Sequence, residues 1–90
     1  MFLYNVTIII EDAAAEEWLQ YMNEFHIPEV MATGKFVSNR LLKIIDSPNE
    51  GTTYCSQYVV ENLADYEDYQ QNHAAKLQAD VQQKFENRFV

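Results

Sequence analysis

Two histidines, His26 and His73, are the side chains of this sequence best suited to proton transfer. An imidazole changes its charge near neutral pH, so it can act as a general acid, a general base or a ligand-binding group. Each histidine falls on the apolar side of a predicted helix, and two helices on the same sheet face would bring the imidazoles into one pocket. Two other interpretations stay open. Each ring can be packed with its nitrogens bonded to a helix end or a tyrosine, or the pair can be an incomplete metal site.

Five further residues complete the candidate pocket. Asn5 and Arg40 are polar residues on strands expected to be buried, where Arg40 would pair with a carboxylate or hold an anionic ligand. The aromatic residues Trp18, Tyr58 and Tyr69 would line the space beneath the helices or belong to the ordinary core. No catalytic role is assigned, and no metal ion or other cofactor is expected. The candidate ligand-binding set is therefore Asn5, Trp18, His26, Arg40, Tyr58, Tyr69 and His73.

Composition argues against several other classes of function. The net charge of -8 disfavours nucleic acid and anionic membrane surfaces as partners, because both are negatively charged. Gly34 and Gly51 are the only glycines, which leaves no glycine-rich phosphate loop. The single cysteine, Cys55, allows no internal disulfide and no Cys-x-x-Cys motif, and it is expected to be a small core residue. Met1 leads directly into a strand without a basic signal region, so the expected compartment is the cytoplasm.

The first part of the chain predicts a strand and a bent helix. Residues 2–10 are apolar and β-branched, which is typical of a buried strand. Asp12 is expected to cap the helix that follows, Pro28 to bend or restart it just after His26, and Gly34 to end it. The apolar stripe of this helix is predicted to be Ala15, Trp18, Leu19, Met22, Phe25 and His26.

The second part predicts a hairpin and a long helix. Residues 36–45 and 52–60 form two strands, joined by a polar turn over residues 46–51. The helix begins near Asn62 or Asp65, and residues 88–90 can begin a fourth strand. The stripe of the long helix is predicted to be Tyr66, Tyr69, His73, Leu77, Val81 and Phe85.

This order of elements predicts a single α+β domain over residues 1–90. A strand, a helix, a hairpin and a second helix fit the ferredoxin-like β-α-β-β-α(-β) arrangement, with an antiparallel sheet and the helices on one face. The first strand is expected in the middle of the sheet, beside the third. No strand has a uniformly polar side, so we expect the helix-free face to pack against a second copy and form a homodimeric α+β barrel.

Several short motifs resemble an uncharacterised family of short bacterial proteins of unknown function. The most specific is His26–Gly34, and the others are residues 4–7, 17–19, 36–38, 40–42 and 64–66. The family is similar to the dimeric α+β barrel superfamily, which implies a ferredoxin-like protomer. Members usually carry a longer C-terminal strand than residues 88–90. The superfamily includes cofactor-independent monooxygenases, isomerases, haem-handling enzymes and proteins without known activity, so the fold implies no single activity.

The leading hypothesis is a homodimeric module that binds a small apolar or weakly acidic molecule between helices and sheet. The first alternative is an enzyme of the cofactor-independent monooxygenase or isomerase type. It would use His26 or His73 as a general base, with Asn5, Arg40 or Tyr58 orienting the substrate. The second alternative is a regulatory protein-interaction module that uses the acidic residues at the helix starts.

Overall fold

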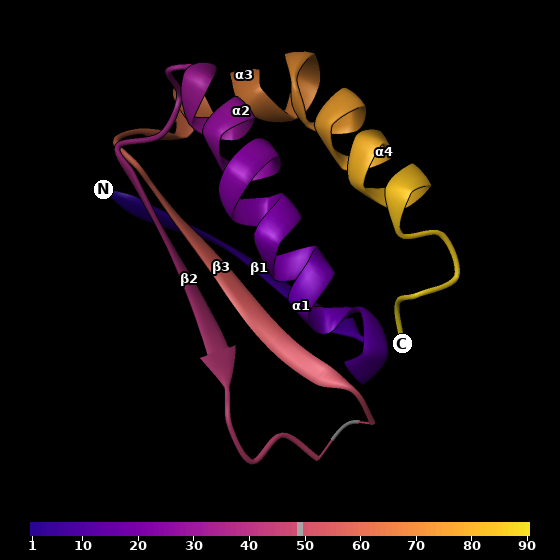
Figure 1. Ribbon diagram of the computed structural model, residues 1–90. Coiled ribbons are helices and arrows are strands. Elements are labelled where there is room, and N and C mark those ends of the chain that lie inside the picture. Colours follow the sequence, from indigo (N-terminus) through magenta and orange to yellow (C-terminus); the bar gives the residue numbers. More distant parts are fainter. Residues whose placement is uncertain (49) are drawn as a thin grey trace.

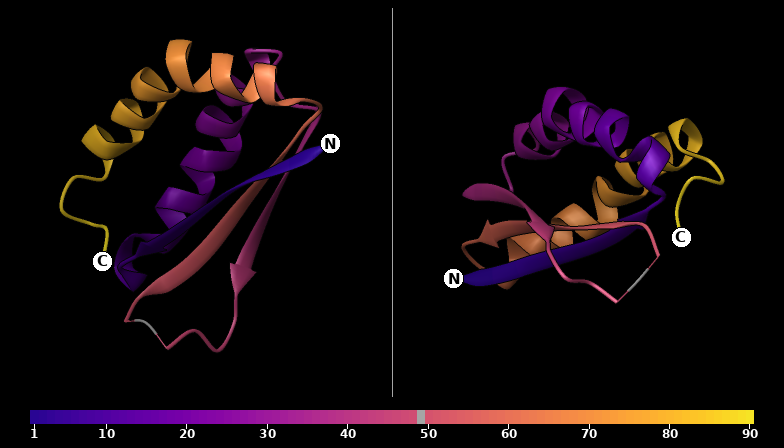
Figure 2. Two further views of the ribbon diagram at one scale, coloured as in Figure 1. Left: turned by 180° about the vertical axis from the view of Figure 1, so that it is seen from behind. Right: turned by 60° about the horizontal axis from the view of Figure 1, so that its bottom comes forward.

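Three strands form an antiparallel sheet in the computed structural model, which describes residues 1–48 and 50–90. They are β1 (Phe2–Ile10), β2 (Ser38–Ile44) and β3 (Thr52–Val60), arranged in the order β1-β3-β2. Strand β3 is therefore central and forms most of the buried part of the sheet. The helices all lie on one side, and the other face of the sheet carries no helix (Figures 1 and 2). The prediction of an α+β domain with helices on one sheet face is confirmed.

The register of the sheet decides which side chains face the helices. Tyr4 lies opposite Tyr58, Val6 opposite Ser56 and Ile8 opposite Tyr54. Because side chains alternate along a strand, these residues share the helix-covered face. The alternate residues of each strand point to the open face, where they are Leu3, Asn5, Thr7, Ile9, Ser38, Arg40, Leu42, Ile44, Thr53, Cys55, Gln57 and Val59.

The first helical stretch contains a wide turn. Helix α1 (Asp12–Tyr21) passes into a π-helical turn, η1 (Met22–His26), and then into α2 (Ile27–Ala32), which has Pro28 in its first turn. The extra residue of a π-turn rotates everything that follows it around the axis. The stripe prediction was wrong at Phe25, which is 52% exposed, while His26 is half-buried.

The second helical stretch is two helices rather than one. Helix α3 (Leu63–Asn72) is capped by Asn62, whose side chain accepts a hydrogen bond from the backbone N–H of Asp65. Helix α4 (Ala74–Lys84) follows after a break at His73, where the backbone leaves helical geometry at φ -129°. The predicted apolar stripe still faces the sheet, and Tyr69, Leu77, Val81 and Phe85 are buried.

The chain ends in a short segment that lies against β1. Ile10 and Phe89 form an isolated antiparallel bridge, and the backbone N–H of Val90 donates to the carbonyl of Ile9 at 2.9 Å. An ion pair between Arg88 and Glu11 holds the same segment. Among the described residues β1 is an edge strand, because this bridge is all that pairs with its outer side. The prediction that β1 lies in the middle of the sheet was wrong.

Two clusters of buried side chains fill the space between helices and sheet. One is built around Trp18, Ile10, Met22 and Phe85, and Trp18 is completely buried with its ring 4.9 Å from that of Tyr54. The other cluster lies at the opposite end of β3 and contains Val30, Phe36, Tyr58, Val60, Tyr69, Ala74 and Leu77. The candidate pocket therefore lies in a region where aromatic side chains make up much of the core.

Two local predictions differ in detail, and a third falls partly outside the described residues. The second strand begins at Ser38 rather than at residue 36, and Phe36 is a buried core residue instead. Asp12 does not cap α1, because its carboxylate accepts a hydrogen bond from the Thr52 hydroxyl at 2.7 Å. The predicted turn over residues 46–51 includes Asn49, which lies outside the described residues.

Candidate functional site

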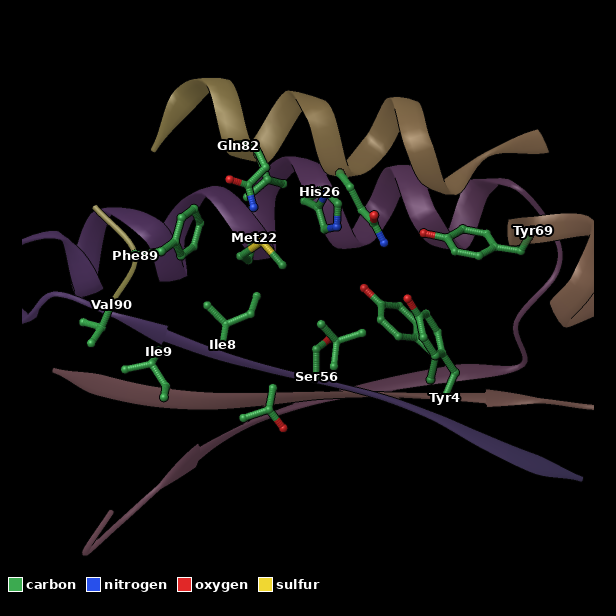
Figure 3. A pocket seen from close by; sticks show the side chains of 15 residues that line it. Tyr4, Ile8, Ile9, Met22, His26, Ser56, Tyr69, Gln82, Phe89 and Val90 are labelled. Carbon is green, nitrogen blue, oxygen red and sulfur yellow. The ribbon is translucent and has the colours of Figure 1, made fainter. Parts of the chain in front are cut away.

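A cavity of about 370 Å3 lies between β1 and the helices. Strands β1 and β3 form its floor, helix α4 and the turn η1 form its roof, and Phe89 and Val90 close one end. Figure 3 shows Tyr4 and Ile8 rising from the sheet while His26, Met22 and Gln82 reach down from the helices. A volume of this size is at the lower end of the range for small-molecule sites, which starts near 300 Å3.

One end of the cavity is formed by phenol rings. Tyr4 stands 6.0 Å from Tyr58 and 6.1 Å from Tyr69, measured between ring centroids. Phe36 packs behind them, 4.8 Å from Tyr69. Burial raises the pKa of Tyr58, and a hydrogen bond with Ser56 opposes this in part. Burial also strongly raises the pKa of Tyr69, so both phenols keep their protons at neutral pH and can donate hydrogen bonds.

His26 is the titratable group of the roof. Burial lowers the pKa of His26 from its usual 6.5, while the negative charges of Glu29 and Asp80 oppose this in part. A desolvated imidazole of this kind is neutral at pH 7 and offers one donor and one acceptor nitrogen. The π-turn η1 is what aims it into the cavity, because an unbroken α-helix would place Phe25 in phase with Trp18.

The other end of the cavity is apolar. Val6 and Ile8 rise from β1, Met22 and Val81 come from the helices, and Phe89 closes the wall. Two amides, Gln78 and Gln82 on α4, stand at the exposed rim. Within the described residues no Lys, Arg, Asp or Glu side chain lines this cavity. The site is therefore an apolar slot with neutral hydrogen-bonding groups at one end.

The structure brings together three members of the predicted candidate set. His26, Tyr58 and Tyr69 line the cavity. His73 lies at the break between α3 and α4, where its ring stacks on that of Tyr69 at 6.2 Å, and it is not among the lining residues. Trp18 is completely buried in the neighbouring core cluster. The two predicted histidines therefore do not converge on one space.

The remaining two candidates lie on the open face of the sheet. Arg40 is exposed on β2, contrary to the expectation that it is buried. Asn5 is exposed on β1 and accepts a hydrogen bond from the Cys55 thiol at 2.6 Å. Cys55 itself is buried, as predicted, because it is a small residue in the central strand between larger neighbours. Neither Asn5 nor Arg40 shares a face with His26.

Sequence reasoning missed Tyr4, Gln78 and Gln82 as lining residues. Tyr4 shares the strand parity of Ile8 and Ile10, and the register of β1 with β3 shows that this parity belongs to the covered face. No comparable pattern marks the two glutamines. They lie on the rim because of the position of α4. That position follows from the break at His73, where α4 separates from α3.

The structure adds two observations about classes of site. Nowhere in residues 1–48 and 50–90 do three His, Cys, Asp or Glu side chains gather closely enough to hold a metal ion. Within the same ranges, no helix combines the length and the apolar character needed to cross a bilayer.

Comparison with known proteins gives one positive result. No curated protein and no solved structure matches the chain. A family profile described as "Domain of unknown function (DUF4286)" matches residues 1–90, which is the whole chain. The resemblance to an uncharacterised family is thereby confirmed, and the chain belongs to the DUF4286 family.

Proposed function

We propose that this domain binds a small apolar or weakly acidic molecule in the cavity beneath α4. The observation that carries the proposal is the division of the cavity into an apolar slot and a neutral polar part, to whose lining Tyr58, Tyr69 and His26 contribute. Such a division favours a ligand with an apolar body and one hydrogen-bonding head group.

The charges of the cavity lining limit which head groups a bound molecule can carry. Because the lining described above carries no cationic side chain, a strong anion would enter the cavity without a partner charge, which is costly. A weak acid avoids this cost, since it can bind in its neutral form or pass its proton to the neutral imidazole of His26. Phenols and weak carboxylic acids are therefore favoured over phosphates or sulfonates.

We also propose that the open face of the sheet packs against a second copy in a homodimeric α+β barrel with a ferredoxin-like protomer. Leu3 is 55% exposed, Leu42 38% and Ile44 42%, although all three lie on regular strands. Burying them in a two-fold interface would remove apolar surface from water. Cytoplasm is the expected compartment, where the thiol of Cys55 stays reduced.

The enzymatic alternative has less support. Of the groups expected to orient a substrate, only Tyr58 shares the cavity with His26, since Asn5 and Arg40 lie on the opposite face of the sheet. Because burial lowers the pKa of His26, its imidazole is unprotonated at neutral pH and free to accept a proton, but the binding proposal requires no reaction.

Ligand binding is tested by thermal shift with matched neutral aromatic compounds, phenols, aromatic carboxylic acids and aryl phosphates. A ligand present at one hundred times its Kd should stabilise the protein by about 2.7 kcal/mol. Tyr58→Phe should weaken binding of the phenols about tenfold, because it removes one buried donor. Tyr54→Phe is the matched control, since Tyr54 is buried against Trp18 outside the cavity. No shift with any compound, or equal losses in both variants, would reject the site.

The dimer is tested by sedimentation at micromolar concentration. Leu42→Lys should dissociate a dimer that is built on the open face, because a charge would be buried there without a partner. Leu63→Lys is the matched control, since Leu63 is 53% exposed on α3 and far from that face. A wild-type monomer at this concentration would reject the dimer.

A further inference from the structure

A chain of three polar side chains crosses the helix-covered face of the sheet. Asn39 of β2 lies opposite Tyr58 of β3, and Ser56 is its diagonal neighbour on the same face. The side-chain nitrogen of Asn39 lies 3.0 Å from the Ser56 hydroxyl oxygen, and Ser56 in turn bonds to the Tyr58 phenol. Ser56, on the floor of the cavity in Figure 3, and Tyr58 both line the cavity, whereas Asn39 does not. The chain therefore connects a residue outside the cavity to one that faces it.

The direction of these hydrogen bonds is fixed at Asn39. Its side-chain nitrogen also lies 3.3 Å from the backbone carbonyl oxygen of Gln57. A carbonyl oxygen can only accept, so the atom facing it must be the NH2 group of the amide and not the amide oxygen. The same NH2 group donates its other hydrogen to Ser56. Because the Ser56 oxygen accepts from Asn39, the Ser56 proton is left for Tyr58.

The bond between Ser56 and Tyr58 decides what the phenol can offer to a bound molecule. This bond opposes the rise in the pKa of Tyr58 that burial causes, which is the effect of a donor to the phenol oxygen. A phenol oxygen that accepts a hydrogen bond on one side carries its own proton on the other. Among the described residues the Tyr58 hydroxyl has no further hydrogen-bond partner. Its proton is therefore free for a molecule in the cavity.

We infer that Asn39 makes the site selective for a ligand whose head group accepts a hydrogen bond, because it orients Ser56 and, through Ser56, the Tyr58 hydroxyl as a donor. This inference rests on the proposed function and narrows its ligand class to molecules that present a carbonyl or similar acceptor oxygen to Tyr58. A ligand with a hydrocarbon group at that place would leave the donor unpaired in a buried site, which is costly. Asn39 is a positioning residue, since it acts through Ser56.

The test uses two probes of the same shape, acetophenone and α-methylstyrene, which differ in having C=O or C=CH2 at one place. Their affinities are measured by titration followed by nuclear magnetic resonance. The wild-type protein should bind acetophenone about tenfold more tightly, which is the worth of one hydrogen bond to a buried donor. Tyr58→Phe should reduce this ratio to about twofold or less, because it removes the donor. The resonance of the acetophenone carbonyl carbon should move downfield on binding to the wild type and move less on binding to Tyr58→Phe.

Asn39→Asp reverses the direction of the chain without changing its shape. The carboxylate accepts the Ser56 proton, the Ser56 oxygen then accepts the Tyr58 proton, and the donor is withdrawn from the cavity. The affinity ratio should fall to about twofold or less, while the affinity for α-methylstyrene stays within about twofold of the wild type. Asn72→Asp is the matched control, since Asn72 is exposed on α3 outside the lining, and it should keep the wild-type ratio.

Ser56→Ala is a second variant that keeps the test decisive if Asn39→Asp does not fold, which circular dichroism determines. It removes the donor to Tyr58 and leaves the phenol free to rotate. The affinity ratio should therefore fall to about threefold, between the values for the wild type and Tyr58→Phe.

The outcomes distinguish this inference from the function on which it rests. A ratio that falls in Tyr58→Phe and in Asn39→Asp or Ser56→Ala, but not in Asn72→Asp, supports the inference. Equal wild-type affinity for the two probes, or binding of phenols without acetophenone, overturns it and leaves the small-molecule site in place. An unchanged ratio in the folded Asn39→Asp or Ser56→Ala protein also overturns it, as does an equal loss of both probes. If no probe and no phenol binds, both proposals are rejected.

Discussion

Gly51 lies so close to Ile10 that a Cβ atom added to it would stand 2.7 Å from the Ile10 carbonyl oxygen. The same atom would stand 2.9 Å from a methyl group of Val90. The start of β3, the end of β1 and the C-terminal segment therefore meet at one point where only a hydrogen fits. The backbone of Gly51 also has φ +103°, a conformation that other residues rarely adopt.

Gly51→Ala should therefore cost more stability than Gly34→Ala. Gly34 also has a positive φ, of +76°, but nothing lies within 4 Å of its added Cβ, so about 1 kcal/mol of backbone strain is expected. Gly51→Ala adds a backbone overlap to similar strain, and about 2–3 kcal/mol is expected. Urea unfolding of the two variants measures the difference, and equal losses would contradict the packing described at Gly51.

The free energy of unfolding should depend on pH through His26. The folded-state pKa of His26 is lowered below 6.5 by burial, so the unfolded chain binds more protons than the folded one once the pH falls through this value. Stability is then complete above about pH 6.5 and decreases as the pH falls toward the folded pKa. His26→Gln should flatten the decrease between pH 7 and 5.5 in thermal unfolding curves. An unchanged slope would show that His26 is not desolvated.

Capping of α3 by Asn62 should be measurable. The side-chain oxygen of Asn62 accepts from the backbone N–H of Asp65 at 2.9 Å. Asn62→Ala should cost about 1 kcal/mol, because this N–H loses its partner within the helix terminus. Asn62→Asp is the control that keeps an acceptor in place, and it should be nearly neutral in urea unfolding. Equal costs for both variants would mean that the cap contributes nothing.

Trp18 should report on the core by its fluorescence. It is the only tryptophan, it is completely buried, and in the described structure its indole N–H has no hydrogen-bond partner. Its emission should be blue-shifted and poorly quenched by acrylamide in the folded state, and should shift to the red on unfolding. Trp18→Ala should cost about 3–5 kcal/mol, as large core truncations do. Strong quenching in the folded protein would contradict the burial.

Much of the fold was predictable because local composition and tertiary packing agree. Residues 52–60 form a strand at the predicted boundaries, since a run of Thr, Tyr and Val lies between Gly51 and a polar turn. The break at His73 was not predictable, because neither glycine nor proline marks it. The edge position of β1 was missed because its apolar composition predicts that the strand is buried. Composition does not reveal whether a neighbouring strand lies on both sides of it.

The candidate site was only partly predictable for a related reason. His26, Tyr58 and Tyr69 were predicted candidates and all three line the cavity, although His26 owes its place to the π-turn η1 and not to ordinary helical spacing. Asn5 and Arg40 were grouped with them because every strand side mixes polar and apolar residues, so sequence alone could not decide which side the helices cover. Only the register of β3 with both neighbours separates the two faces.

The wide turn η1 has a consequence for how this pocket can change over generations. Loss of a single residue between Trp18 and Phe25 would return the helix to ordinary winding and would leave His26 seven positions after Trp18, still over the sheet. Loss of the wide turn without loss of a residue would instead bring Phe25 over the sheet, and an imidazole roof would become a benzyl one without any substitution. The polarity of the site is thus encoded in helix winding as much as in residue identity.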